Sequence, residues 1–112
     1  MNKELAKRAV ACKRWRWMPG MRVVRDNAWS EPLSQRVPCT VPNGGYPDAW
    51  PDLDDPATLG CLLALVREAR NDSTLYAHPY GQGWRWRSNY RDCTAIYGSE
   101  IEALVAALEA AP

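Results

Sequence analysis

Two segments of this chain carry complete start signals for an amphipathic helix. In the first, Asp55 is a favourable N-cap, and Pro56 suits the first helical position because that position needs no backbone N–H. Apolar residues then repeat at the spacing of one widened helical face: Leu59, Cys61, Leu62, Leu63, Leu65 and Val66. We expect a helix here that ends near Ala69 to Asn71 and is covered on more than one side.

The second segment lies near the C-terminus. Gly98 interrupts the preceding structure, and Ser99 followed by Glu102 forms a capping box. The apolar residues again fall on one helical face: Ile101, Leu104, Val105 and Leu108. The alanines between them have high intrinsic helix propensity. We expect a helix over this segment.

A weaker helix is expected from about Lys3 to Arg14, where the apolar stripe is short and the opposite face is basic. Pro19-Gly20 ends any helical continuation. Four further segments have strand character: Met21 to Arg25, Leu75 to His78, Gly83 to Asn89 and Cys93 to Tyr97. A turn is expected over Pro79 to Gly83, which would pair the two middle segments.

This order of elements predicts an α+β fold in which three helices pack on a small, mainly antiparallel sheet, an α-β-α sandwich-like arrangement. A chain of 112 residues with 46% hydrophobic residues forms one domain, residues 1–112. Residues from about 30 to 52 contain five prolines and Gly44-Gly45, so we expect a long loop there.

A tetrad of alternating tryptophan and arginine occurs twice, as Arg14-Trp15-Arg16-Trp17 and, in opposite phase, as Trp84-Arg85-Trp86-Arg87. Indole rings and guanidinium groups together suit stacking on flat rings and binding of phosphates or carboxylates. The alternative is architectural: on a strand, tryptophan packs inward while arginine lies outside. We expect at least three of these four tryptophans to belong mainly to the core, which leaves the arginines as the better functional candidates.

Composition narrows the function classes. The net charge is +1, whereas dedicated nucleic-acid binders carry a clear basic excess, so we expect no nucleic-acid partner. Weak nucleic-acid binding by the basic first helix remains an alternative. The N-terminus has no signal-peptide core and no segment suits a membrane span, so we expect a cytoplasmic protein without a membrane partner. The four cysteines are widely spaced, which disfavours a zinc site.

Catalytic signals are weak. His78 is the only histidine and precedes a proline, which favours a surface or hydrogen-bonded role. Asp52, Asp54 and Asp55 resemble a cation cluster, but helix capping explains two of them. No phosphate-binding glycine loop is present. We expect no enzymatic activity, no cofactor and no metal.

The chain resembles small proteins of tailed bacteriophages that carry the phage α-β-α sandwich domain. Four segments carry the resemblance: residues Leu5 to Met21, Pro51 to Ala69, Gly83 to Asn89 and Ile96 to Pro112. The shared features are helix caps and core positions, so no functional residue is transferred. The resemblance implies a phage or prophage origin, a location in the host cytoplasm and an accessory role.

Two functions follow as hypotheses. The first is a sponge that binds a nucleotide-like immune signal of the host, at a pocket that a small domain would build between the subunits of a homo-oligomer. The alternative is a protein-binding inhibitor of a host defence complex. The candidate ligand-binding residues are Arg14, Arg16, Trp17, Tyr80, Trp84, Arg85, Trp86, Arg87 and Arg91.

Overall fold

The structure, a computed structural model, describes residues 3–25, 30–32, 49–93 and 95–111. Within these ranges the chain forms eight elements in order: α1 (Lys3–Ala11), β1 (Arg22–Arg25), β2 (Ser30–Pro32), β3 (Ala49–Pro51), α2 (Pro56–Ala69), β4 (Tyr76–Tyr80), β5 (Gly83–Arg87) and α3 (Glu100–Glu109). β1 lies between β2 and β3 in one antiparallel sheet, and β4 pairs with β5 in a separate antiparallel hairpin.

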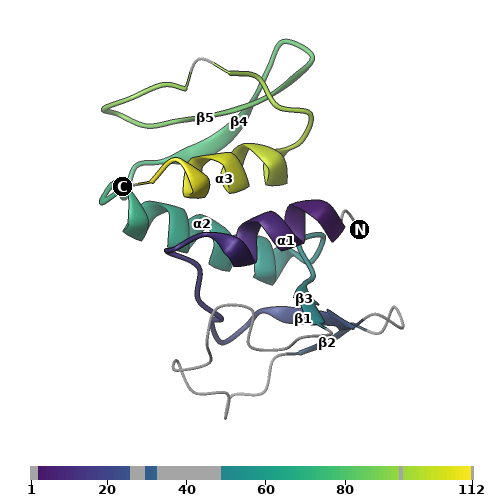
Figure 1. Cartoon of the computed structure of the whole chain (residues 1–112). Coiled ribbons are helices and arrows are strands. Elements are labelled where there is room, and N and C mark those ends of the chain that lie inside the picture. Colours follow the sequence, from purple (N-terminus) through teal and green to yellow (C-terminus); the bar gives the residue numbers. More distant parts are fainter. Residues whose placement is uncertain (1–2, 26–29, 33–48, 94, 112) are drawn as a thin grey trace.

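The helices lie between these two sheets (Figure 1). The β4–β5 hairpin rests on α3, while α1 and α2 lie on the other side of α3, next to the β1–β3 sheet. The expected α+β fold, with three helices among the described residues and antiparallel strands, is confirmed. The layering differs from the expectation, because the strands form two sheets that enclose the helices instead of one sheet with helices on its faces.

Both predicted helix starts are confirmed. The N–H of Thr58 donates to the Asp55 carboxylate at 3.0 Å, and the N–H of Glu102 donates to the Ser99 hydroxyl at 3.1 Å. The Glu102 carboxylate reaches back and accepts from the N–H of Gly98 at 3.1 Å. These bonds satisfy N–H groups that a helix start otherwise leaves open, and each cap stabilises its helix by about 1 kcal/mol.

The C-terminal end of α2 is closed by a Schellman motif. The N–H of Asp72 bonds to the carbonyl of Arg67 at 2.9 Å, and the N–H of Asn71 bonds to the carbonyl of Glu68 at 3.1 Å. Asn71 has a φ of 51°, the left-handed conformation that this motif requires and that asparagine tolerates better than most residues. The motif reverses the chain at this point and leads it toward β4.

α1 ends at Ala11, earlier than the expected Arg14. The chain then turns through a bond from the N–H of Trp15 to the carbonyl of Cys12 at 3.1 Å. This turn places Trp15 (3% exposed) and Trp17 (5% exposed) in the core, with their rings edge to face at 5.5 Å.

The ends of the proline-rich segment expected as a loop over about 30–52 form the strands β2 and β3. Both are edge strands of their sheet. Proline has no backbone N–H, and an edge strand tolerates it at positions that would not bond to the central strand, as at Pro32 and Pro51. Sequence reasoning missed them because each strand is short and contains proline. Residues 33–48 lie outside the described part of the chain.

The predicted hairpin is confirmed, with a shorter turn than expected. Gly81 has a φ of 62° and lies between the paired Tyr80 and Gly83. Pro79 pairs with Trp84, whose N–H points away from β4 and donates to the carbonyl of Tyr97 at 2.8 Å. This pair of residues exchanges no hydrogen bond, so the missing N–H of Pro79 costs no bond within the hairpin. The third strand expected over Cys93 to Tyr97 is present as isolated bridges only, Trp84 with Tyr97 and Arg87 with Asp92.

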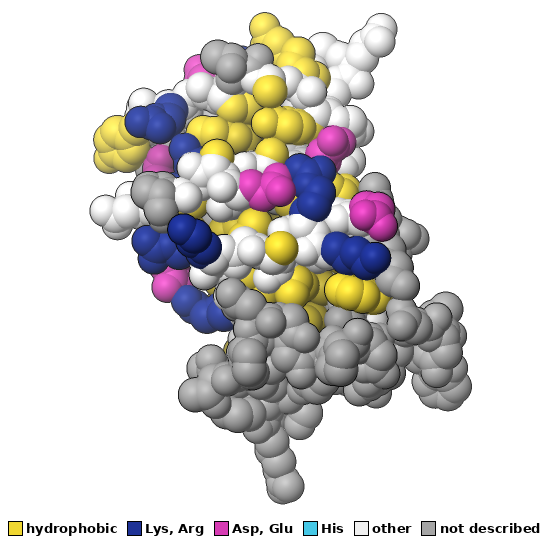
Figure 2. Space-filling view, in the orientation of Figure 1, with side chains coloured by type: hydrophobic (Ala, Val, Ile, Leu, Met, Phe, Trp, Pro, Cys, Tyr) yellow, Lys and Arg dark blue, Asp and Glu magenta, His cyan; other side chains and the backbone are white. Residues whose placement is uncertain are grey.

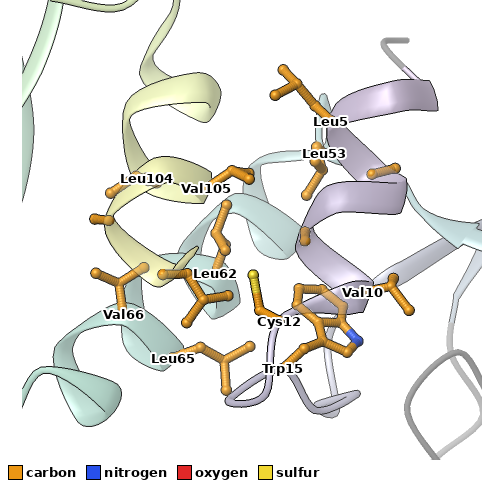
Figure 3. Close-up of a cluster of buried hydrophobic side chains, with 14 of the residues drawn as sticks. Leu5, Val10, Cys12, Trp15, Leu53, Leu62, Leu65, Val66, Leu104 and Val105 are labelled. Atoms are coloured by element: carbon orange, nitrogen blue, oxygen red, sulfur yellow. The ribbon is translucent and has the colours of Figure 1, made fainter. Parts of the chain in front are cut away.

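The core fills the space between the three helices (Figure 3). Leu62 and Val66 of α2 lie toward α3, which supplies Leu104 and Val105, whereas Leu65 points toward Trp15. The side of α1 supplies Leu5 and Val10, and Trp15 closes the lower end of the cluster. Trp86 of β5 is also buried, with 6% of its surface exposed. Three of the four tetrad tryptophans are therefore core residues, as expected.

Candidate functional site

The nine predicted ligand-binding residues do not converge on one pocket. They divide among the turn after α1, the outer face of the β4–β5 hairpin, and a cleft beside the C-terminal end of α2. Trp84 belongs to the inner face of the hairpin and is half-buried. Each group offers different chemistry.

The first tetrad supplies charge but no free ring. Trp17 is buried, so its ring faces are covered by the core. Arg14 and Arg16 are exposed, and the Arg16 guanidinium forms a salt bridge with Glu68 of α2 at 2.7 Å. This bond lowers the pKa of the Glu68 carboxyl below its ordinary value. The group mainly joins the turn to α2.

The basic face of α1 is largely balanced by acidic side chains. Arg8 forms two bonds to the Glu109 carboxylate of α3, at 2.6 and 3.2 Å, and Lys7 lies 3.8 Å from Glu4. In Figure 2, dark blue basic groups and magenta acidic groups accordingly lie side by side across this face. A hollow of about 450 Å³ borders this pair and also Lys13 and Arg14. Arg8 and Glu109 balance each other, whereas Lys13 and Arg14 add positive charge to its rim.

The cleft beside the C-terminal end of α2 collects arginines and rings. It consists of two adjoining hollows of about 290 and 240 Å³ that share Arg70, Trp86 and Arg91. Tyr90 borders the first hollow and is 82% exposed, whereas Tyr97 borders the second. We call this feature the Arg70–Arg91 cleft.

Arg70 is held in this cleft by two contacts. Its guanidinium lies 4.4 Å from the centroid of the Trp86 ring, and one of its nitrogens donates to the carbonyl of Ala107 at 3.1 Å. Partial burial and then the nearby positive charge of Arg91 lower the pKa of Arg70 below its ordinary value, although it stays protonated near neutral pH. The cleft therefore holds two positive charges close enough to repel each other.

Within the described part of the chain, the Arg91 side chain forms neither a salt bridge nor a hydrogen bond. Its backbone is nevertheless fixed, because its N–H donates to the Ser88 hydroxyl at 3.0 Å and its carbonyl accepts from the N–H of Ser88 at 2.7 Å. Two acids border the cleft: Asp72 accepts from the Thr74 hydroxyl at 2.6 Å, and Asp92 forms a salt bridge with Arg87 at 3.2 Å. The Ser88 and Thr74 hydroxyls lower the pKa of Asp72, which stays ionised.

Sequence reasoning found Trp86 and Arg91 but missed Arg70 and Tyr90. The sequence placed Arg70 at the end of a helix and gave it no other role. Arg70 and Trp86 are far apart along the chain, so the sequence does not reveal their contact. Tyr90 did carry a signal, since it stands directly before Arg91 in a segment rich in rings and arginines.

The outer face of the hairpin holds the other three predicted residues. The Arg85 guanidinium lies 4.0 Å from the centroid of the Tyr80 ring, and its Nε donates to Nε2 of His78 at 3.0 Å. Arg87 forms a salt bridge with Asp92 at 3.2 Å. His78 is thus hydrogen-bonded, in line with its expected role.

Two cysteines, Cys12 and Cys61, have thiols of low reactivity. Burial raises the pKa of Cys12, and burial followed by the charge of Asp55 raises the pKa of Cys61. A raised pKa keeps a thiol protonated and therefore weakly nucleophilic. Among the described residues, no group of three or more His, Cys, Asp or Glu side chains is arranged to hold a metal ion.

No protein-family model, curated protein or solved structure matches the chain. No helix among the described residues is long and apolar enough to cross a membrane.

Proposed function

We propose that this protein is a non-enzymatic binder of small anionic molecules that carry a flat ring, of the nucleotide type, and that the Arg70–Arg91 cleft is its site. The observation that carries the proposal is the pair of neighbouring guanidinium groups, one of them without a salt bridge in the described structure. An anion in the cleft would be attracted by both guanidinium groups and would reduce their mutual repulsion, which the Asp72 carboxylate offsets only in part in the free protein.

The surrounding side chains suit the rest of such a ligand. Arg91 is free to bind a phosphate with two parallel hydrogen bonds, while Arg70 contributes charge from its fixed position over Trp86. The exposed ring of Tyr90 offers a stacking surface for a base at the mouth of the cleft. None of these groups is an activated nucleophile, so capture without turnover is the chemistry they support.

The small size of the cleft favours a ligand site that two subunits build together. Each hollow is near or below the lower end of the range for small-molecule sites. A second copy placed over Tyr90 would enclose a ligand that one subunit leaves half open. In this proposal the protein is a homo-oligomer. With the sequence resemblance to phage proteins, capture fits an accessory protein that withholds a nucleotide-like immune signal in the host cytoplasm.

A protein partner is the second candidate function. Tyr90 is 82% and Ile96 55% exposed, and both are large side chains of the segment that follows β5. Exposed tyrosine beside arginine is typical of the residues that dominate protein interfaces. In this case the chain would block a host complex through the same edge of the molecule.

Native mass spectrometry of the protein purified from cell extract distinguishes these functions. A bound mass of a few hundred daltons per subunit supports ligand capture, whereas a stoichiometric added mass of many kilodaltons supports a protein partner.

Calorimetric titration with mononucleotides, cyclic dinucleotides and inorganic phosphate then tests the site. Arg91→Ala should lose at least about 10-fold in affinity, because one charge-assisted pair contributes about 1.5–3 kcal/mol. Arg16→Ala is the matched control, since Arg16 is an exposed arginine outside the cleft. Absence of binding to every probe at millimolar concentration would sink the proposal.

A further inference from the structure

The outer face of the β4–β5 hairpin carries a row of rings that the capture site does not use. Register places Tyr76 opposite Arg87 and His78 opposite Arg85, so these four side chains and Tyr80 share one face of the hairpin. The opposite face bears Trp86, which is buried against the body of the protein. We call the five outward residues the hairpin face.

The rings of the hairpin face lie in a row, with two exposed tyrosines and a half-buried His78 between them. The Tyr76 and His78 centroids lie 5.7 Å apart, and the His78 and Tyr80 centroids lie 6.4 Å apart. Tyr76 is 42% and Tyr80 47% exposed. Rings of this size are more often buried in the core of a protein. Alternate residues of one strand thus present a repeated aromatic surface about 13 Å long.

Arg85 is built into this surface. It lies against Tyr80 and donates to His78, so its guanidinium is held against the row of rings. Arg87 lies opposite Tyr76, with Asp92 as its acidic partner. The five residues of the face include no acid. Asp92 balances Arg87, so the positive charge of the face comes from Arg85.

The positive charge and the repeated rings of the hairpin face together indicate which kind of molecule would bind there. A second copy docked face to face would bring Arg85 against its own symmetry mate, which like charges oppose. An acidic protein surface would pair with the arginine and could cover the rings, but it does not repeat a flat group at the spacing of these rings. A single-stranded nucleic acid presents both a repeated base and a repeated phosphate, which this face can stack against and neutralise.

We propose that the hairpin face binds single-stranded nucleic acid by stacking two or three bases on Tyr76, His78, Tyr80 and Arg85. Binding is weak and depends only slightly on salt, because Asp92 already pairs with Arg87 and Arg85 alone is left to face a phosphate. Neutralisation of one phosphate predicts that the affinity falls with a log–log salt slope of about −0.7. This local surface departs from the expectation drawn from net charge, which averages over the whole chain.

The test measures fluorescence anisotropy of eight-nucleotide oligo-uridine and oligo-thymidine probes, single-stranded and as duplexes. Tyr76→Leu and Tyr80→Leu should each weaken single-strand binding about 10-fold, since stacking on one ring contributes that much per base. Arg16→Gln is the control, because it removes an exposed arginine outside the face and should leave oligonucleotide binding unchanged. Circular dichroism confirms that each variant is folded, and Arg85→Gln provides a second variant that keeps all the rings.

Three results would overturn the proposal: equal affinity for duplex and single strand, unchanged affinity in the Tyr76, Tyr80 and Arg85 variants, or equally effective competition by polyglutamate. The last result would identify a surface for acidic proteins. The outcome is separable from that of the cleft, since Tyr76→Leu should weaken oligonucleotide binding and leave mononucleotide binding unchanged.

Discussion

The guanidinium of Arg70 lies over the ring of Trp86 at 4.4 Å from its centroid, and this contact joins the end of α2 to the β4–β5 hairpin. The same arginine bonds the carbonyl of Ala107 near the end of α3. One side chain therefore ties together three elements that bound the proposed ligand cleft. It also covers one face of Trp86, which leaves Tyr90 as the accessible ring.

Replacement of Arg70 by alanine should lower the free energy of unfolding by about 1–2 kcal/mol, because it removes a partly desolvated cation–π contact and a charged hydrogen bond. Urea denaturation followed by tryptophan fluorescence measures the change. Arg91→Ala is the comparison, and its stability should stay within about 0.5 kcal/mol of the wild type. Equal losses in the two variants would contradict the structural role of Arg70.

Replacement of Thr58 by valine should destabilise the protein by about 1–3 kcal/mol. The Thr58 hydroxyl is fully buried, accepts from the N–H of Arg22 at 2.7 Å and donates to Asp55 at 3.1 Å. Valine keeps the shape but leaves the Arg22 N–H without its acceptor. Thr58→Ser retains the hydroxyl and should lose less stability. The midpoints of urea denaturation show which of the two variants is less stable.

Replacement of Asn71 by alanine should cost about 1 kcal/mol, because its φ of 51° strains most side chains. Asn71→Gly should be neutral or stabilising, since glycine adopts this conformation freely. Thermal unfolding monitored by circular dichroism compares the two. A stability of Asn71→Ala equal to that of Asn71→Gly would show that the left-handed conformation carries no strain at this position.

Stability should fall with acidification below about pH 4. The pKa values of Asp72 and Glu68 are lower in the folded than in the unfolded chain, so both groups stabilise the fold above their unfolded pKa. This contribution disappears as the pH falls through their folded pKa values. A double variant, Asp72→Asn with Glu68→Gln, should show a flatter loss between pH 5 and 2 in denaturation series. An identical pH profile would exclude these two carboxylates as the cause.

The helix starts and the hairpin followed from the sequence because they depend on neighbours in the chain. Asp55, Pro56 and Ser99 act within one helical turn, and the alternation of Trp84 to Arg87 defines the two faces of β5 without reference to the rest of the fold. The burial of Trp86 followed from the same local pattern.

The candidate sites depended much more on long-range contacts. The sequence by itself determined the three helices, the hairpin and the predominance of tryptophan in the core, because caps and apolar periodicity are local properties. Only the tertiary structure decided that the strands form two sheets around the helices, and that Arg70 meets Trp86 and Arg91 while Tyr80 and Arg85 lie on another face. Packing between distant segments made these choices, since burying the helices' wide apolar faces selects among arrangements that the same local signals allow.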